Sequence, residues 1–324
     1  MIEVNNICKT YSVIQKGEGF RGALKGLISR ESKTVQAVKN LSFHIQPGEI
    51  VGFIGPNGAG KSTTIKMMSG ILTPSSGEIL INGRDIHKYR KQVVQDIGVV
   101  FGQRSQLDWD LRLGESFELL RHIYRIDKAK YQETLDIMDK ILEIKPLLSK
   151  PVRQMSLGQR VKGDLVAAML HEPSVLFLDE PTIGLDVGAK YSLRKFVKEV
   201  NEERNTTVIL TTHDLGDIEQ LCDRIIIINN GELIEDGNLE EIVDRIAPYK
   251  TLVVEYYDEK APEHAQCELF FHEGNVAKYR FMKKDITAAA LIQALSAEVQ
   301  IKDVSIEEAG IDDIIRIAYG QLKE

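Results

Sequence analysis

Short apolar runs bounded by glycine, proline or aspartate recur along the chain up to about residue 230. A run of this kind, without alternating polar residues, is typical of a parallel strand that is buried on both faces. Helical patterns separate the runs, so the sequence predicts an α/β fold. The predicted strands are residues 50–54, 97–101, 175–178, 208–210 and 225–228.

The stretch of residues 116–145 follows a different pattern. Its apolar residues have heptad-like spacing, and no strand signals interrupt them. We therefore expect a helical subdomain, at about residues 104–165, inserted into the α/β core.

The pattern changes again near Ala247. The elements predicted beyond this point are strands at 252–257, at 277–282 and near Val299, and a helix that opens at Asp285. Ser305 and Glu308 have the spacing of a capping box, which predicts a last helix opening at Ser305. We therefore expect two domains, residues 1–245 and a small α+β accessory domain, 246–324.

Composition limits the class of protein. Of 324 residues, 43% are hydrophobic and 27% charged, as in globular proteins. No apolar run approaches the roughly 20 residues that a membrane-spanning helix needs. The net charge of -7 gives no general attraction to phosphate backbones, so we expect no nucleic acid partner. The amino terminus lacks a secretory signal pattern, which favours a cytosolic location, and the cysteines lack metal-ligand spacing.

The strongest chemical signal is a glycine-rich segment between a predicted strand and a predicted helix. It fits G-x-x-x-x-G-K-[ST] with Gly55, Pro56, Asn57, Gly58, Ala59, Gly60, Lys61, Ser62 and Thr63. Glycines let backbone N–H groups turn toward phosphate oxygens, and the following helix directs its positive end to the same charge. We expect Lys61 to reach the β and γ phosphates of ATP and Ser62 to hold Mg²⁺.

A second signal lies at the end of the predicted strand 175–178, where Asp179 and Glu180 follow directly. Open α/β sheets bind ligands at the carboxyl ends of their strands. We expect Asp179 to hold Mg²⁺ through its water shell. Glu180 would then activate the attacking water as a general base.

Between these motifs, the run Met155-Ser156-Leu157-Gly158-Gln159 resembles the ABC signature, usually Leu-Ser-Gly-Gly-Gln. Further matches follow the family's order: Tyr11 resembles the aromatic that stacks on adenine, Gln103 the loop glutamine, Gly184-Leu185-Asp186 the D-loop, and His213 the switch histidine. Residues 1–240 therefore resemble the ATP-binding subunits of ABC transporters. The resemblance implies an ABC-type P-loop ATPase core that uses ATP and Mg²⁺.

The resemblance also implies roles for these residues. Ser156 and Gln159 have the spacing of a helix-capping pair. In the family this helix end, with Gly158, is presented to the γ-phosphate on a second subunit, whereas an isolated helix needs Ser156 only as its cap. Asp186 belongs to the nucleotide site, Gln103 senses Mg²⁺ and the attacking water, and His213 contacts the γ-phosphate.

An additional segment, residues 13–36, is longer than the family usually has at this place. Phe20, Ala23, Leu24, Leu27 and Ile28 fall on one helical face, and Arg21, Lys25 and Arg30 fall elsewhere. We hypothesise a basic amphipathic helix at residues 20–30 that contacts the membrane surface or the membrane subunit. The alternative is a surface hairpin packed on its own domain.

Trp109, the one tryptophan of the chain, follows the loop glutamine closely. The family docks a cytoplasmic helix of its membrane partner beside this loop, and aromatic residues are frequent interface anchors. Trp109 is therefore either a partner contact or a core residue of the helical subdomain.

The resemblance implies an ATPase subunit that works with transmembrane permease subunits and a second ATPase subunit at the cytoplasmic face of the membrane. Residues 304–308 and the predicted final helix resemble the accessory domains of drug and polysaccharide exporter subunits, which favours export. A soluble ABC ATPase acting on ribosomes or nucleic acid is the alternative. A single motif set and the lack of a long coiled coil disfavour it. The presence of Glu180 disfavours a regulator without turnover.

Overall fold

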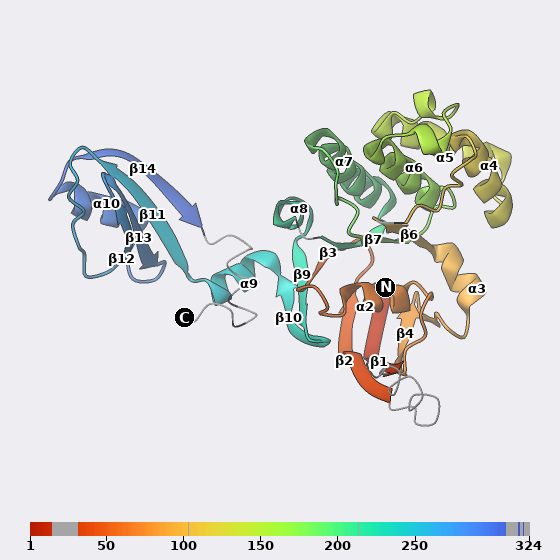
Figure 1. The fold of residues 1–324 in the computed structure, drawn as a ribbon, viewed down its shortest axis with the longest axis horizontal. Coiled ribbons are helices and arrows are strands. Elements are labelled where there is room, and N and C mark those ends of the chain that lie inside the picture. The colour runs from red at the N-terminus through yellow and green to blue at the C-terminus, as the bar shows by residue number, and fades with distance from the viewer. Residues whose placement is uncertain (15–31, 103, 213, 309–316, 318–319, 321–324) are drawn as a thin grey trace, which may run out of the picture. The chain divides into compact units, whose positions relative to one another are not determined.

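The chain folds into two compact units, Met1–Gly237 and Asn238–Glu324 (Figure 1). The computed structural model describes every residue except 15–31, 103, 213, 309–316, 318–319 and 321–324. The second unit begins with α9 (Leu239–Ile246), whose Asp244 carboxylate pairs with the Lys283 ammonium at 2.5 Å. The sequence pattern instead placed the boundary after residue 245, because the alternation of apolar residues starts only beyond this helix.

A six-stranded sheet forms the centre of the first unit. Its strands are β3 (Ile50–Ile54), β6 (Ile97–Phe101), β7 (Val175–Asp179), β8 (Thr207–Thr211), β9 (Arg224–Asn229) and β10 (Glu232–Asn238). The order across the sheet is β10-β9-β3-β8-β7-β6, and the pairs from β9 to β6 are parallel. All the strands predicted from apolar runs are therefore confirmed.

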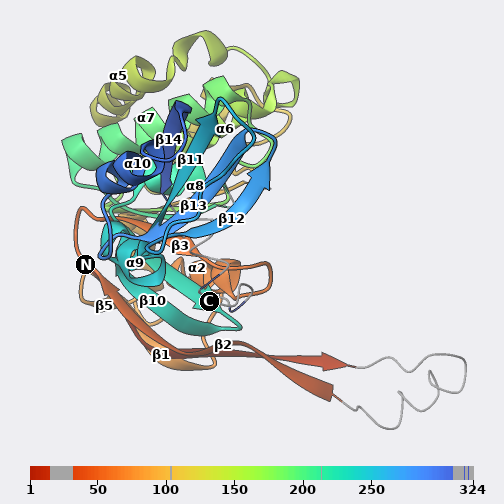
Figure 2. The ribbon, with the colours of Figure 1, turned by 90° about the vertical axis from the view of Figure 1, so that its left-hand side faces the viewer.

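An antiparallel sheet packs on the central one, in the order β2-β1-β4-β5. Its strands are β1 (Ile2–Ile14), β2 (Ser32–Ile45), β4 (Ser76–Ile81) and β5 (Arg84–Asp85). Figure 2 shows β1 and β2 running side by side, with their far ends extended beyond the rest of their sheet. Of the segment 13–36, residues 13–14 lie in β1 and residues 32–36 lie in β2. The proposed amphipathic helix, residues 20–30, lies outside the described residues.

The main hydrophobic core joins the two sheets. Ile2 of the antiparallel sheet, Phe53 and Phe177 of the central sheet, and Ile65 of a helix belong to one buried cluster. The described helices of the first unit outside the helical subdomain are α2 (Lys61–Met68), α3 (Arg90–Val93), α7 (Val187–Arg204) and α8 (Leu215–Leu221). This packing holds the loop between β3 and α2 against the carboxyl ends of the central strands.

The stretch predicted to be helical, residues 116–145, is helical. It lies in α4 (Leu113–Tyr124) and α5 (Lys128–Leu142), followed along the chain by α6 (Leu157–Met169). 3-10 turns occur at Val94–Asp96, Lys145–Leu147 and Val152–Gln154. A buried carboxylate of α6 connects this region to the chain beyond β6: Asp164 accepts hydrogen bonds from the Ser105 hydroxyl at 2.8 Å and the Gln106 amide at 3.1 Å.

The second unit is a four-stranded antiparallel sheet with a helix. Its strands, in the order β12-β13-β11-β14, are β11 (Tyr249–Tyr256), β12 (Glu268–Glu273), β13 (Val276–Met282) and β14 (Ile301–Glu308), and its helix is α10 (Ala288–Ser296). The last helix predicted to open at Ser305 is wrong at that position. Ser305 pairs with Val253 of β11, because the strand partner decides the backbone conformation where the capping-box spacing alone does not.

In the part of the chain that the structure describes, no helix is long and apolar enough to span a membrane.

Replacing Asp164 by asparagine is expected to stabilise the fold at neutral pH. Asp164 is 6% exposed, and burial raises its pKa to about 6, against the hydrogen bonds from Ser105 and Gln106 and the charge of Arg160. In the unfolded chain the Asp164 carboxyl titrates near the ordinary value of about 3.9. Between about pH 4 and pH 6 the native state therefore holds a proton on Asp164 that the unfolded state has lost, and the protein loses stability as pH rises through this range.

Asp164→Asn keeps an acceptor oxygen without the charge. We expect its free energy of unfolding to exceed the native value by about 1–3 kcal/mol at pH 7 and to differ little at pH 4. Urea denaturation at both pH values measures this difference. An equal difference at the two pH values would contradict the assignment.

Candidate nucleotide-binding site

The loop between β3 and α2 has the backbone that phosphate binding needs. Gly58 and Gly60 have φ angles of 84° and 105°, which side chains disfavour. A Cβ on Gly60 would also lie 2.7 Å from the Ala37 carbonyl oxygen of β2. Gly60 is the N-cap of α2 and has no side chain to bond the first amides of the helix. These amides therefore remain suited to an anion.

Lys61 is the first residue of α2, and its side chain lies inside this loop. Its ammonium donates to the carbonyl oxygens of Gly55 at 2.6 Å and Pro56 at 3.2 Å, and the residue is 5% exposed. Burial lowers the pKa of Lys61, and the negative charges of Glu180 and Asp179 oppose that shift. A cation enclosed by the loop and facing two carboxylates is suited to neutralise phosphate oxygens.

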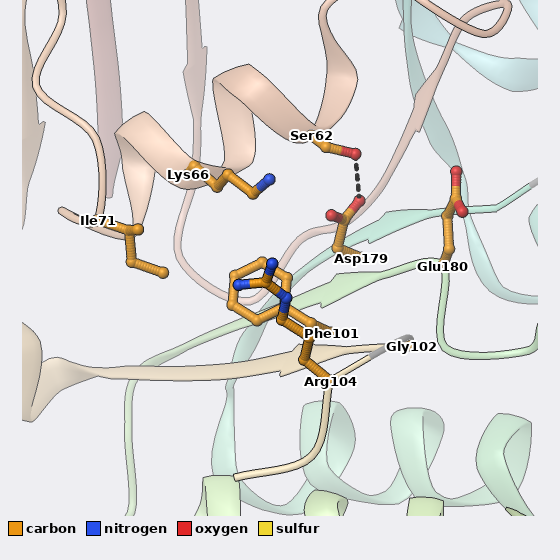
Figure 3. A pocket seen from close by; sticks show the side chains of 8 residues that line it. All are labelled: Ser62, Lys66, Ile71, Phe101, Gly102, Arg104, Asp179 and Glu180. Atoms are coloured by element: carbon orange, nitrogen blue, oxygen red, sulfur yellow. Dashed lines mark hydrogen bonds between the residues drawn. The ribbon is translucent and has the colours of Figure 1, made fainter.

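Ser62 and Asp179 come from different elements and meet at the same edge of the sheet. The Ser62 hydroxyl donates to Asp179 Oδ1 at 3.2 Å (Figure 3). Among the described residues, no group of three or more His, Cys, Asp or Glu side chains could hold a metal. Mg²⁺ usually binds one or two protein oxygens and completes its shell with phosphates and water. The hydroxyl and carboxylate oxygens of this pair fit such an ion.

Glu180 follows β7 directly in a left-handed conformation, with a φ angle of 56°. Its N–H group donates to both the carbonyl and the hydroxyl oxygen of Thr211, each at 3.0 Å. A Cβ on Gly102, just beyond β6, would lie 2.0 Å from the Glu180 carbonyl oxygen. The neighbouring strands therefore hold the turn at Glu180 on both sides, and the Glu180 side chain extends on the same side as Asp179 (Figure 3).

The signature run forms a helix end, as its spacing predicts. The Gln159 amide donates to the Ser156 hydroxyl at 3.3 Å, and the Ser156 amide donates to Gln159 Oε1 at 3.2 Å. Leu157, in place of the family's first glycine, directs its side chain toward Gly184. Asp186 caps α7 through the Ala189 amide at 2.8 Å. Within the described residues, no hydrogen bond joins these helix ends to the phosphate loop.

The remaining predicted site residues divide into two groups. Gln103 and His213 lie outside the described residues. Tyr11 lies in β1 opposite Val35 of β2, on the hairpin whose Ala37 carbonyl faces Gly60, and its ring is partly exposed. The structure thus brings together the phosphate loop, Asp179 and Glu180, with Tyr11 on a neighbouring strand.

Comparison with known proteins decides the family. A family model described as "ABC transporter" matches residues 38–183. The chain is 32% identical to the uncharacterized ABC transporter ATP-binding protein YhcH of Bacillus subtilis, over 89% of this chain and 92% of that protein. The chain belongs to the ABC transporter ATP-binding proteins.

Other relatives and solved structures agree. The ABC ATPase is 32% identical to the ATP-binding protein NatA of Bacillus subtilis, over 66% of this chain and 87% of that one. A dimeric ATP-binding cassette in a post-hydrolysis state, bound to ADP and Pi, matches with a TM-score of 0.62 and 27% identity, over 74% of this chain and 99% of that chain. The fold is the ABC-type P-loop ATPase fold, and the chain is an ATPase.

The structure adds cations that the sequence motifs did not indicate. A cleft beside Ser62, Asp179 and Glu180 is also lined by Lys66 and Arg104 (Figure 3). Lys66 lies one helical turn after Ser62 on α2, and helix periodicity could have placed it on the same face. Arg104 depends on the turn of the chain after β6, which no local pattern predicts.

Ser156→Ala is expected to destabilise the ABC ATPase by about 1 kcal/mol, because it removes the cap of α6. Ser156→Asn keeps a capping oxygen and should cost only a few tenths of a kcal/mol. Chemical denaturation of the two variants measures the difference. Equal stabilities of the alanine variant and the native chain would show that the cap contributes nothing.

Proposed function

We propose that this ABC ATPase powers a membrane exporter through ATP-driven closure of two ATPase subunits. One observation carries the proposal: Lys61, Ser62, Asp179 and Glu180, from distant parts of the sequence, converge at one edge of the central sheet. A cation, a hydroxyl and two carboxylates beside a glycine loop are the groups that cleavage of a terminal phosphate requires.

In this proposal the glycine loop and Lys61 bind the β and γ phosphates of ATP. Ser62 and Asp179 would hold Mg²⁺, which neutralises charge on the phosphate oxygens. Glu180 accepts a proton from the water that attacks the γ-phosphate. Gln103 and His213 complete the site near the Mg²⁺ and the γ-phosphate, and Tyr11 stacks on adenine.

A second subunit would supply the signature helix end. Ser156 and Asp186 are exposed, and so are the apolar side chains of Val187, at 85%, and Tyr191 at the start of α7. Exposed apolar residues beside helix ends that suit a phosphate support an interface between two subunits.

Ser156→Asn tests the role of Ser156 at the phosphate of the second subunit. Loss of hydrolysis at unchanged stability supports this role, and full activity would limit Ser156 to capping.

Permease subunits are the proposed membrane partners, which would place the ATPase at the cytoplasmic face of the membrane. Trp109 is 51% exposed, so it is not a core residue of the helical subdomain. The Arg160 guanidinium lies 5.1 Å from the centre of its ring and supports the indole from one side. A half-exposed tryptophan with a supported ring suits an interface anchor. The relatives named as ABC transporter ATP-binding proteins favour a transporter over a soluble ABC ATPase of ribosomes or nucleic acid.

The direction of transport rests on the relatives. Similar proteins include a bacitracin transport ATP-binding protein of Bacillus licheniformis and a Nod factor export protein of Cupriavidus metallidurans, but also a methionine import protein of Latilactobacillus sakei. The first two are 35% and 32% identical over 66% and 64% of this chain, and the importer is 28% identical over 90% of it. The Nod factor export protein is the relative that supports export. Everted membrane vesicles that accumulate cargo on addition of ATP would identify an exporter. Right-side-out vesicles loaded with ATP inside that accumulate cargo would identify an importer.

Glu180→Gln tests the proposed function. Because the variant keeps its shape but cannot accept a proton, we expect ATP hydrolysis to fall at least about 100-fold. With ATP and Mg²⁺ the variant should elute as a stable dimer in size-exclusion chromatography. Glu219→Gln, which changes an exposed glutamate of α8, is the matched control and should behave like the native chain. Normal turnover of Glu180→Gln would remove Glu180 as the base.

Trp109→Ala tests the partner surface. It should reduce co-purification of membrane proteins with the ATPase, because the half-exposed indole is the proposed partner contact. ATP binding should stay intact, because Trp109 has no role in the proposed nucleotide site. Trp109→Phe, which keeps a ring against Arg160, should retain most of the assembly. Loss of folding in the alanine variant would contradict an interface role.

A further inference from the structure

Thr211, the last residue of β8, forms hydrogen bonds with both residues of the acidic pair. It lies opposite Asp179 in the parallel register of β7 and β8. Its hydroxyl donates to Asp179 Oδ1 at 2.7 Å and accepts the Glu180 N–H group at 3.0 Å. The residue is completely buried. The same hydroxyl therefore donates to one residue of the site and accepts from the next.

These two bonds have different consequences. The bond to Asp179 restricts the carboxylate whose Oδ1 also accepts from Ser62. The bond from Glu180 stabilises a left-handed backbone that a glutamate does not favour by itself. A methyl group in place of the hydroxyl would remove one of the two hydroxyl donors to Asp179 Oδ1 and one acceptor of the Glu180 amide. One hydroxyl oxygen thus contributes to the geometry of both acidic residues, beside the Ser62 hydroxyl on Asp179 and the Thr211 carbonyl on Glu180.

The neighbouring threonine has other partners. The Thr212 hydroxyl lies 3.2 Å from that of Thr182 and accepts the Asp214 amide at 2.9 Å. Successive residues at a strand end point to opposite sides, so adjacent hydroxyls serve different neighbours. The contact with Asp179 and Glu180 belongs to Thr211.

We propose that Thr211 is a positioning residue for ATP hydrolysis, whose hydroxyl holds Asp179 and Glu180 in the orientation in which they act. The inference rests on the proposed function of these two carboxylates. Thr211 itself touches neither ATP nor the attacking water in this assignment. Its effect is on the geometry of the two residues that do.

The test compares Thr211→Val, which has the same shape without the hydroxyl, with Thr211→Ser, which keeps the hydroxyl. The full-length chain is purified together with the membrane proteins that accompany it. We expect Thr211→Val to lower kcat about 10- to 100-fold, as loss of a group that orients a metal ligand does. The Mg²⁺ concentration for half-maximal activity should rise, and ATP binding without Mg²⁺ should stay unchanged. Thr211→Ser should remain close to native activity.

Thr134→Val is the matched control. Thr134 is also a completely buried threonine with a hydroxyl bond, to Glu172 at 3.1 Å, but it lies in α5. It should lower Tm without lowering kcat at a temperature well below Tm. If Thr211→Val does not fold, Thr211→Ala is measured in its place.

The outcomes separate the inference from the function on which it rests. Native kcat in Thr211→Val, while Glu180→Gln is inactive, overturns the role of Thr211 alone. A serine variant as slow as the valine variant also overturns it, because the hydroxyl would then not be the cause. Native activity in both Thr211→Val and Glu180→Gln overturns the proposed function itself.

Discussion

The parallel register of β7 and β8 is the constraint on which the rest of the site depends. It places Asp179 opposite Thr211 at the carboxyl edge of the sheet, where β3 delivers the phosphate loop. Asp179 Oδ1 then accepts from Ser62 and Thr211, which joins α2, β7 and β8 at one atom. Because the strands on both sides of Asp179 are buried and paired, the carboxylate has little freedom to move.

The proposed site residues fall into a buried group and an exposed group. Lys61, Asp179 and Thr211 are buried and bonded within the subunit, which suits groups that must keep a fixed orientation. Ser156 and Asp186 instead cap exposed helix ends. In the proposed function the buried groups form one half of a phosphate site, and the exposed helix ends offer the other half to a second subunit. This division supports the proposal that two subunits complete each site.

Local pattern succeeded where a single physical requirement determined the residues. The buried strands need uninterrupted apolar side chains, and the phosphate loop needs glycines at positive φ, so both were predictable. The helix predicted to open at Ser305 was wrong because capping-box spacing also occurs in a strand, and only the pairing with β11 distinguishes a strand from a helix here. The alternatives for Trp109 stayed open because one aromatic residue suits both a core and an interface, and its exposure excludes the core.

The sequence by itself determined the strand, loop and helix order and the chemical types at the site, since these depend on residues close together along the chain. Tertiary structure alone decided that Thr211 bonds both Asp179 and Glu180, that Arg104 lines the adjoining cleft, and that α9 belongs with the second unit. Each of these facts joins residues far apart in sequence. Strand register and side-chain burial create such contacts, and no local pattern encodes them.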